Sequence, residues 1–347
     1  MLKYLGHVPG VSIPTLHIGM LFSTSCWSSA PHGLPYIQYQ HTGAPTIWHC
    51  VPKSQESKLQ SALKELVPTL VPDKPCWLKE DWLMVNPKHL SQHGVHVEKC
   101  VQYPGQFVVV FPGAFTSTIS CGYNVSESVH FALPSWLPKG LEASLILNKS
   151  EEQELFSMCS LLCQLVQDEK VEASTLAVAL PLLSALINKE LDLRNQLSAA
   201  GLKGEKSDTF SDSPSSSAIT NKRRSSTTDD KICDVSNKIC YFSMVLVDQG
   251  EQTLCIEQGV KHIQRRKNIK STKLFVQFTQ NELEAMLKKA KDRLNSMSCL
   301  EGSSSNGSGS SIINGASSVS LSLSNTSIGN TSGSKTRHNS RQSSSTS

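Results

Sequence analysis

The side chains in this chain that are best suited to holding a metal ion are cysteines and histidines. Four residues near the C-terminal end have the ligand types and number of one tetrahedral zinc site: Cys233, Cys240, Cys255 and His262. The short Cys-x-x-Cys clips of such sites are missing, because Ser236 and Gln258 stand where the second cysteines would be. The fold would therefore have to bring the four ligands together. The alternative is a metal-free segment held by packing.

Four further histidines are candidate ligands, since neutral imidazole commonly binds metals: His32, His41, His49 and His130. His49 and His130 each alternate with apolar neighbours, which is the pattern of a strand with one buried face. We interpret these histidines as structural residues.

Two groups of basic residues are candidates for other kinds of contact. Lys222-Arg223-Arg224 precedes Ser225-Ser226, which indicates a nuclear import signal or a kinase site. The second group would neutralise DNA or RNA phosphates: Lys261, Arg265, Arg266, Lys267, Lys270 and Lys273. A solvated surface is the alternative for both groups, because the net charge of +4 is well below that of a dedicated DNA-binding domain.

The type of secondary structure that the sequence predicts around these residues changes along the chain. From Val11 to about Trp136, short aromatic and β-branched runs are broken by Pro, Gly and Ser, which is typical of an all-β sandwich or barrel. The expected strands include Gly19–Phe22, Tyr36–Tyr39, Thr46–Val51 and Gln106–Phe111. Within this region Ser54–Leu66 has leucines at helical spacing and predicts one amphipathic helix packed outside the barrel.

The rest of the chain divides by composition. Residues 141–202 have apolar residues at helical spacing, and residues 203–231 are too polar to form a core, which predicts a flexible linker. A second compact piece, residues 232–298, ends in a helix over Asn281–Leu294, and residues 299–347 form a serine-rich tail expected to be disordered. Eleven cysteines without the framework of a small secreted domain indicate a reducing, intracellular setting. The longest apolar runs are too short for a membrane span.

Three stretches together resemble the JmjC domain of the Jumonji chromatin proteins: Gly19–Trp27, Tyr39–Trp48, and Pro104–Phe107 through Gly122–Asn124. The resemblance covers about Gly6 to Trp136, returns at Ile232–Leu287, and is strongest to the branch associated with Polycomb repressive complex 2. It implies a mainly β fold, with a cupin-like double-stranded β-helix (jelly roll) over residues 1–140. A helical segment and a small degenerate zinc-finger-like module are expected to follow.

Active members of this family hold ferrous iron with two histidines and a carboxylate, and they oxidise methylated histone lysines with 2-oxoglutarate. The resemblance places Ser28, Ala30 and Thr116 at the three ligand positions. Thr46 stands at the position of the lysine that pairs with 2-oxoglutarate, and Pro35 at that of a tyrosine contacting it. Neutral hydroxyls and a methyl group cannot hold a hard divalent ion against its hydration shell. We therefore expect no cofactor in the barrel, and at most one zinc in the C-terminal module.

These residues lead us to expect a non-catalytic JmjC chromatin factor in the nucleus. It would act as a transcriptional regulator or repressor whose partners are Polycomb repressive complex 2 subunits. One alternative is an active Fe(II)/2-oxoglutarate-dependent histone lysine demethylase or hydroxylase, which would bind iron and 2-oxoglutarate saturably. Another is DNA or RNA contact through the second basic group, with an affinity that falls as salt rises. Because the chain enters the family pattern partway, we also expect a C-terminal portion whose barrel lacks its opening strand.

Overall fold

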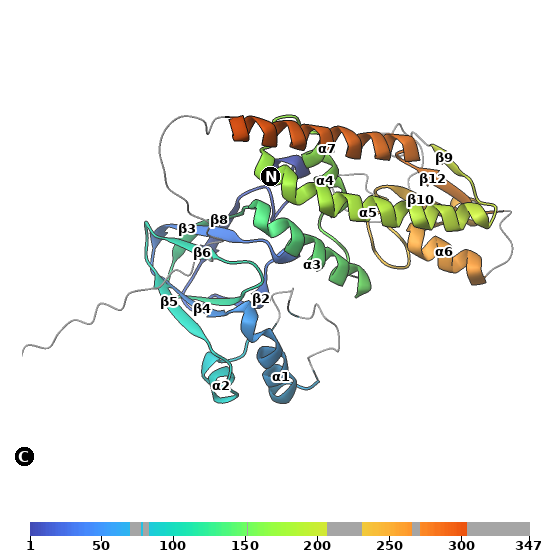
Figure 1. Ribbon diagram of the computed structural model, residues 1–347. Helices are drawn as coiled ribbons and strands as arrows, with labels where there is room; N and C mark the ends of the chain where they lie inside the picture. Colours follow the sequence, from blue (N-terminus) through green and yellow to red (C-terminus); the bar gives the residue numbers. More distant parts are fainter. Residues whose placement is uncertain (70–77, 79–82, 151, 207–230, 266–270, 304–347) are drawn as a thin grey trace, which may run out of the picture. The chain divides into compact units, whose positions relative to one another are not determined.

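The computed structural model describes residues 1–69, 78, 83–150, 152–206, 231–265 and 271–303 (Figure 1). The first eight strands are β1 (Thr15–Gly19), β2 (Thr24–Ser29), β3 (Tyr36–Gly43), β4 (Thr46–Val51), β5 (Glu98–Gln102), β6 (Phe107–Val110), β7 (Phe115–Ser120) and β8 (Asn124–His130). Short 3-10 helices lie at Leu2–Leu5, Pro31–Gly33, Lys53–Gln55, Pro134–Trp136 and Asp248–Gly250. No helix within the described residues is both long and apolar enough to cross a membrane.

The eight strands form two four-stranded antiparallel sheets with the strand order of a jelly roll. One sheet has the order β1-β8-β3-β6 and the other β2-β7-β4-β5 (Figure 1). The mainly β barrel predicted from the sequence is thus present, together with the helices expected around it. Strand β1 lies at one edge of the first sheet and pairs with β8, and the expectation that the barrel lacks an opening strand stays a prediction.

Three of the four strands expected from apolar runs are confirmed, as β3, β4 and β6. The fourth, Gly19–Phe22, is wrong, since only Gly19 belongs to a strand. The following residues turn the chain from β1 into β2: the Ser23 amide donates to the Met20 carbonyl at 2.9 Å, and Phe22 has a φ of 64°. A positive φ is incompatible with an extended strand, whatever the hydrophobicity of the run.

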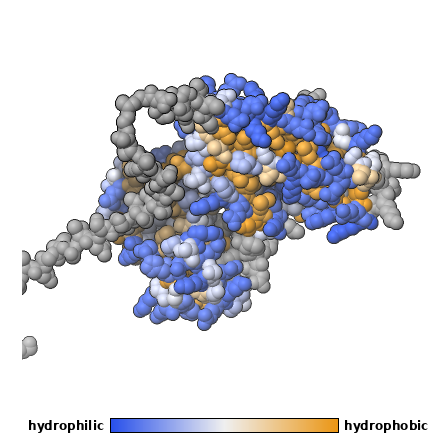
Figure 2. Space-filling view, in the orientation of Figure 1, coloured by the Kyte–Doolittle hydropathy of each residue, from blue (hydrophilic) through white to orange (hydrophobic). Residues whose placement is uncertain are grey.

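Helices α1 (Glu56–Leu66) and α2 (Pro87–Gln92) pack against the second sheet. Leu59 and Leu63 of α1 share one buried cluster with the strand residues Trp27, Val51 and Phe115. The amphipathic helix predicted outside the barrel is therefore confirmed. The surface over α1 and α2 is mostly hydrophilic in Figure 2, as expected for a helix that buries only one face.

The helical segment consists of α3 (Leu137–Lys149), α4 (Met158–Gln167) and α5 (Ala173–Ala199). The Ser157 hydroxyl accepts a hydrogen bond from the Ser160 amide and so caps the start of α4. Leu161, Leu162 and Leu176 lie in one large core, to which α7 (Gln280–Ser303) adds Leu283. The helical pattern after Pro138 thus encodes helices that pack on one another.

A third four-stranded sheet, with shorter strands, has the order β11-β10-β12-β9. It contains β9 (Gly204–Lys206), β10 (Ser243–Val247), β11 (Gln252–Leu254) and β12 (Lys273–Val276), and helix α6 (Ile256–Arg265) packs on it. The segment predicted as a flexible linker therefore begins with a strand, because β9 pairs in parallel with β12. The predicted tail boundary at residue 299 lies inside α7. The rest of that linker up to residue 230, and residues 304–347, lie outside the described part.

Candidate functional site

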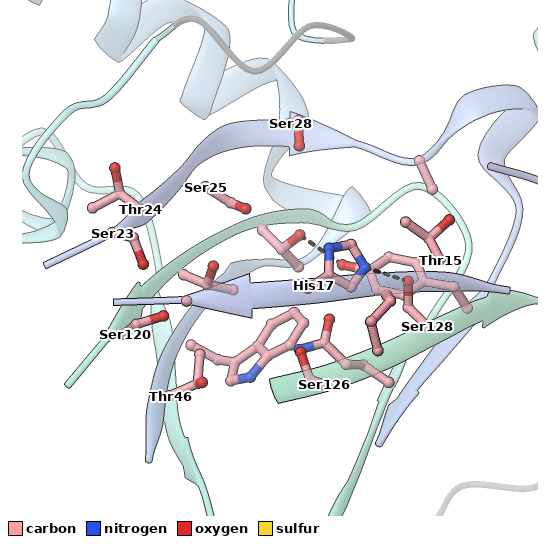
Figure 3. A pocket seen from close by; sticks show the side chains of 18 of the residues that line it. Thr15, His17, Ser23, Thr24, Ser25, Ser28, Thr46, Ser120, Ser126 and Ser128 are labelled. Atoms are coloured by element: carbon pink, nitrogen blue, oxygen red, sulfur yellow. Dashed lines mark hydrogen bonds between the residues drawn. The ribbon is translucent and has the colours of Figure 1, made fainter. Parts of the chain in front are cut away.

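A cavity of about 650 Å³ opens between the two sheets of the barrel (Figure 3). Strands β1, β2, β3, β4, β7 and β8 all contribute to its lining. Half of the lining residues are serine or threonine: Thr15, Ser23, Thr24, Ser25, Ser28, Ser29, Thr46, Thr116, Thr118, Ser120, Ser126 and Ser128. The lumen of this barrel is therefore polar, and much of its polarity comes from hydroxyl groups.

The hydroxyl lining follows from strand periodicity. On β7 every second residue faces the cavity, namely Thr116, Thr118 and Ser120. On β8 the same alternation brings Asn124, Ser126, Ser128 and His130 to the lumen. Of these residues, the sequence indicated Thr116 and His130 as candidate site residues and Asn124 as part of a family motif. The signal for the others was the period-2 placement of Ser and Thr on both strands.

Four of the five degenerate positions identified from the sequence come together in this cavity. Ser28, Ala30, Thr46 and Thr116 all line it, and Ser28 and Thr116 are direct partners on the neighbouring strands β2 and β7. The fifth, Pro35, does not line the cavity; its carbonyl accepts a hydrogen bond from the Phe131 amide at 3.1 Å.

At the neighbouring position, Tyr36 does line the cavity. Its hydroxyl shares a 3.1 Å hydrogen bond with Thr116 Oγ1. The resemblance placed Pro35 at the position of the tyrosine that contacts 2-oxoglutarate. The tyrosine that reaches the lumen here is the next residue, Tyr36.

The polar groups of the lumen are partly paired with one another and carry no formal charge near neutral pH. His17 Nε2 lies 2.7 Å from Ser128 Oγ, which Figure 3 shows as a dashed line. Burial lowers the pKa of His17 and of His130, although a hydrogen bond to the Pro35 carbonyl opposes the shift at His130. Burial also raises the pKa of Tyr36. Both imidazoles and the phenol are therefore neutral at pH 7.

Residues 15–131 match a family described as "JmjC domain, hydroxylase". Over 83% of its length the chain is 36% identical to "Protein Jumonji" of Gallus gallus. The chain belongs to the JmjC-domain family. It is also 38% identical over 40% of its length to "Lysine-specific demethylase JMJ703" of Oryza sativa subsp. japonica, and 28% identical over 83% to "Lysine-specific demethylase 5D" of Homo sapiens. The matches span 24%, 11% and 18% of these three relatives, so the JmjC chain corresponds to a quarter or less of each.

The donor set of the JmjC cavity does not fit ferrous iron. The three ligand positions offer the hydroxyls of Ser28 and Thr116 and the methyl group of Ala30. The described lining contains no carboxylate, and its only imidazoles are those of His17 and His130. A two-histidine, one-carboxylate site needs an anionic ligand to compete with the hydration shell of a divalent ion. The described lining therefore offers ferrous iron no suitable set of ligands.

Three of the four histidines that the sequence offers as further candidate metal ligands lie outside the cavity lining. His32 stacks on Phe156 with ring centroids 4.1 Å apart, and His41 Nε2 lies 3.0 Å from the Glu127 carboxylate on the exposed side of the sheet. His49 is on β4, and burial, with the nearby Lys99, lowers its pKa. Only His130 reaches the lumen. The geometry therefore agrees with a structural role for these three.

The zinc ligand set predicted from the sequence is not assembled in the described part of the chain. Cys233, Cys240 and Cys255 are buried in one apolar cluster, and His262 lies in the last turn of α6. Within the described residues, no group of three or more His, Cys, Asp or Glu side chains is arranged to hold a metal ion. A hydrogen bond between the Cys255 and Cys233 thiols lowers the pKa of Cys233 and raises the pKa of Cys255. A zinc ion bound by these residues stays a prediction.

The basic groups are described only in part. Lys261 and Arg265 are exposed on α6, and Lys273 is exposed at the start of β12. Arg266, Lys267, Lys270 and Lys222-Arg223-Arg224 lie outside the described residues. The contact with nucleic acid stays a prediction.

Proposed function

We propose that this chain is a non-catalytic member of the JmjC family, a pseudo-enzyme whose barrel serves as a scaffold in a nuclear chromatin factor. One observation carries the proposal: eight strands form the two sheets of a jelly roll, whereas Ser28, Ala30 and Thr116 stand together where iron ligands are expected. A lumen of neutral hydroxyls supports binding and not oxidation, because oxygen activation in this family depends on the metal.

The proposed biological role is transcriptional repression together with Polycomb histone methyltransferase machinery. It is supported by the similarity to "Protein Jumonji" over most of the chain and by the resemblance of the motif around Cys26-Trp27-Ser28 to the Polycomb-associated branch. The similarity to two lysine-specific demethylases supports the competing role, an active demethylase. The barrel scaffold is shared between these roles, and the neutral donor set supports the non-catalytic one.

Turnover of methylated histone peptides separates the two roles. The full chain is incubated with ferrous iron, 2-oxoglutarate and mono-, di- and trimethyl-lysine peptides, and mass spectrometry follows the loss of methyl groups. We expect no demethylation above the rate without protein, with an active lysine-specific demethylase as the positive control. Demethylation in proportion to protein concentration would contradict the proposal.

The partner is tested separately by affinity purification of the tagged protein from nuclei. We expect histone methyltransferase subunits in the purified material and none in a mock purification from untagged nuclei. Purified material without these subunits would exclude the Polycomb role but leave the absence of catalysis standing.

A further inference from the structure

We propose that the barrel cavity is a binding site for an uncharged, multiply hydroxylated small molecule of about the size of a monosaccharide. The inference rests on the proposed function, because iron and 2-oxoglutarate would otherwise occupy the same space. The inference also goes beyond the proposed function, since a scaffold needs no ligand of its own.

Charge excludes most other classes of ligand. No Asp, Glu, Lys or Arg is found among the described residues that line the cavity, and its two histidines are neutral at pH 7. A carboxylate, phosphate or ammonium group in this lumen would lose hydration without meeting an opposite charge. The lining therefore disfavours both the dicarboxylate cosubstrate and a cationic lysine side chain.

The hydrogen-bonding capacity of the lumen favours a ligand that both donates and accepts. Thr46 Oγ1 accepts a hydrogen bond from Asn124 Nδ2 at 3.3 Å, and Ser126 Oγ accepts one from Gln38 Nε2 at 3.1 Å. Each of these buried hydroxyls keeps its own proton to donate and a second lone pair to accept. An apolar ligand would leave such groups unpaired, at a cost to affinity. Hydroxyl groups on a ligand match both capacities.

The size and rigidity of the cavity suit the same class. Its volume of about 650 Å³ lies within the range of small-molecule sites, roughly 300–1,000 Å³. Six strands hold the lining, so the site is formed before any ligand arrives. Trp48 and Tyr36 add aromatic surface to the lining, and the Trp48 indole is fixed by a 2.9 Å hydrogen bond to Gln102. Aromatic rings in a polar site provide apolar surface for the C–H faces of a sugar or cyclitol ring.

The test uses the full chain and a panel of defined probes. Glucose, N-acetylglucosamine and myo-inositol are compared with succinate and methylammonium by ligand-observed NMR and calorimetry. At least one neutral polyol should bind saturably in the millimolar range, with an affinity that does not change between low and high salt. Failure of all three polyols to saturate, or binding of the charged probes alone, would overturn the inference.

A matched pair of variants places the binding in the cavity. Thr116→Val with Thr118→Val keeps the β-branched shape of two lining residues but removes two hydroxyls, and should weaken polyol binding about tenfold. Thr253→Val, on β11 outside the cavity, should leave it unchanged. If the double variant fails to fold, Ser126→Ala gives a single-site test with a roughly threefold loss expected. Equal affinity in a folded cavity variant and in the control would also overturn the inference.

Failure of the polyols to bind leaves the proposed function intact. Saturable binding of iron with 2-oxoglutarate would instead contradict the proposed function itself.

Discussion

At the residue scale, the chemistry of this barrel depends on which atoms reach its lumen. Ser28 and Thr116 face each other across β2 and β7 as neutral hydroxyls, and Ala30 offers no donor atom. These three identities could be predicted from the sequence, because the surrounding motif fixes their register. The place of Tyr36 beside Thr116 could not, since it depends on the local path of the chain after Pro35.

Gln102 is the residue that fixes the aromatic part of the lumen. It is buried, accepts a hydrogen bond from Trp48 Nε1 at 2.9 Å, and donates to the carbonyls of Gln38 and Gln106 at 3.1 Å. Gln102→Leu keeps a similar volume but leaves these partners unpaired, so the free energy of unfolding should fall by about 2–4 kcal/mol in a urea titration. Trp48→Phe should lower the free energy of unfolding less in the Gln102→Leu variant than in the parent chain, because the hydrogen-bond partner of the indole is already lost. If the losses of unfolding free energy in the two single variants add up to the loss in the double variant, the side chains of Gln102 and Trp48 do not interact.

At the element scale, strand alternation explains both the success and the failures of prediction from sequence. β3, β4 and β6 were recognisable because their apolar runs are long enough to show their type. The run Gly19–Phe22 was misleading because the turn conformation of Phe22 overrides its hydrophobicity. Strand β9 could not be predicted, since its one glycine and two charged residues become a strand only by pairing with the distant β12.

The turn between β3 and β4 is held by a glycine that no other residue can replace without strain. Gly43 has a φ of 94°, and a Cβ atom there would lie 2.2 Å from the Tyr123 carbonyl oxygen. Gly43→Ala should therefore lower the free energy of unfolding by more than about 3 kcal/mol, from backbone strain and overlap together. Gly105→Ala is the matched control, because Gly105 also has a positive φ of 83° but faces open space. It should cost only about 1–2 kcal/mol, and an equal loss in both variants would exclude the overlap.

At the scale of the whole molecule, the helical part and the small sheet are joined by partly buried charges. Glu257 of α6 meets Lys238 and, from α5, Lys189, each at 2.9 Å. Burial alone would raise the pKa of Glu257, but the two ammonium groups lower it to about 2. Packing and this ion pair connect α5 to α6, and the zinc predicted for this region stays a prediction.

The Glu257 interaction gives stability a defined pH dependence. The pKa of this carboxyl is below its ordinary value of 4.5 in the folded state, so the stabilisation is complete above pH 4.5 and is lost as pH falls toward 2. Glu257→Gln should be less stable than the parent by on the order of 2 kcal/mol near pH 6. The difference should shrink as the pH of the urea titrations is lowered through this window. A difference that stays constant from pH 6 to pH 3 would contradict the role of the charge.

The absence of an iron site is tested most directly by calorimetric titration of the full chain with ferrous iron or manganese in the presence of 2-oxoglutarate. A restored variant, Ser28→His with Ala30→Glu, Thr116→His and Thr46→Lys, is the positive control at the same cavity positions. We expect no saturable heat for the parent chain and metal binding in the micromolar range for the restored variant. Saturable micromolar binding by the parent chain would show that its barrel still holds the cofactors of an active oxygenase.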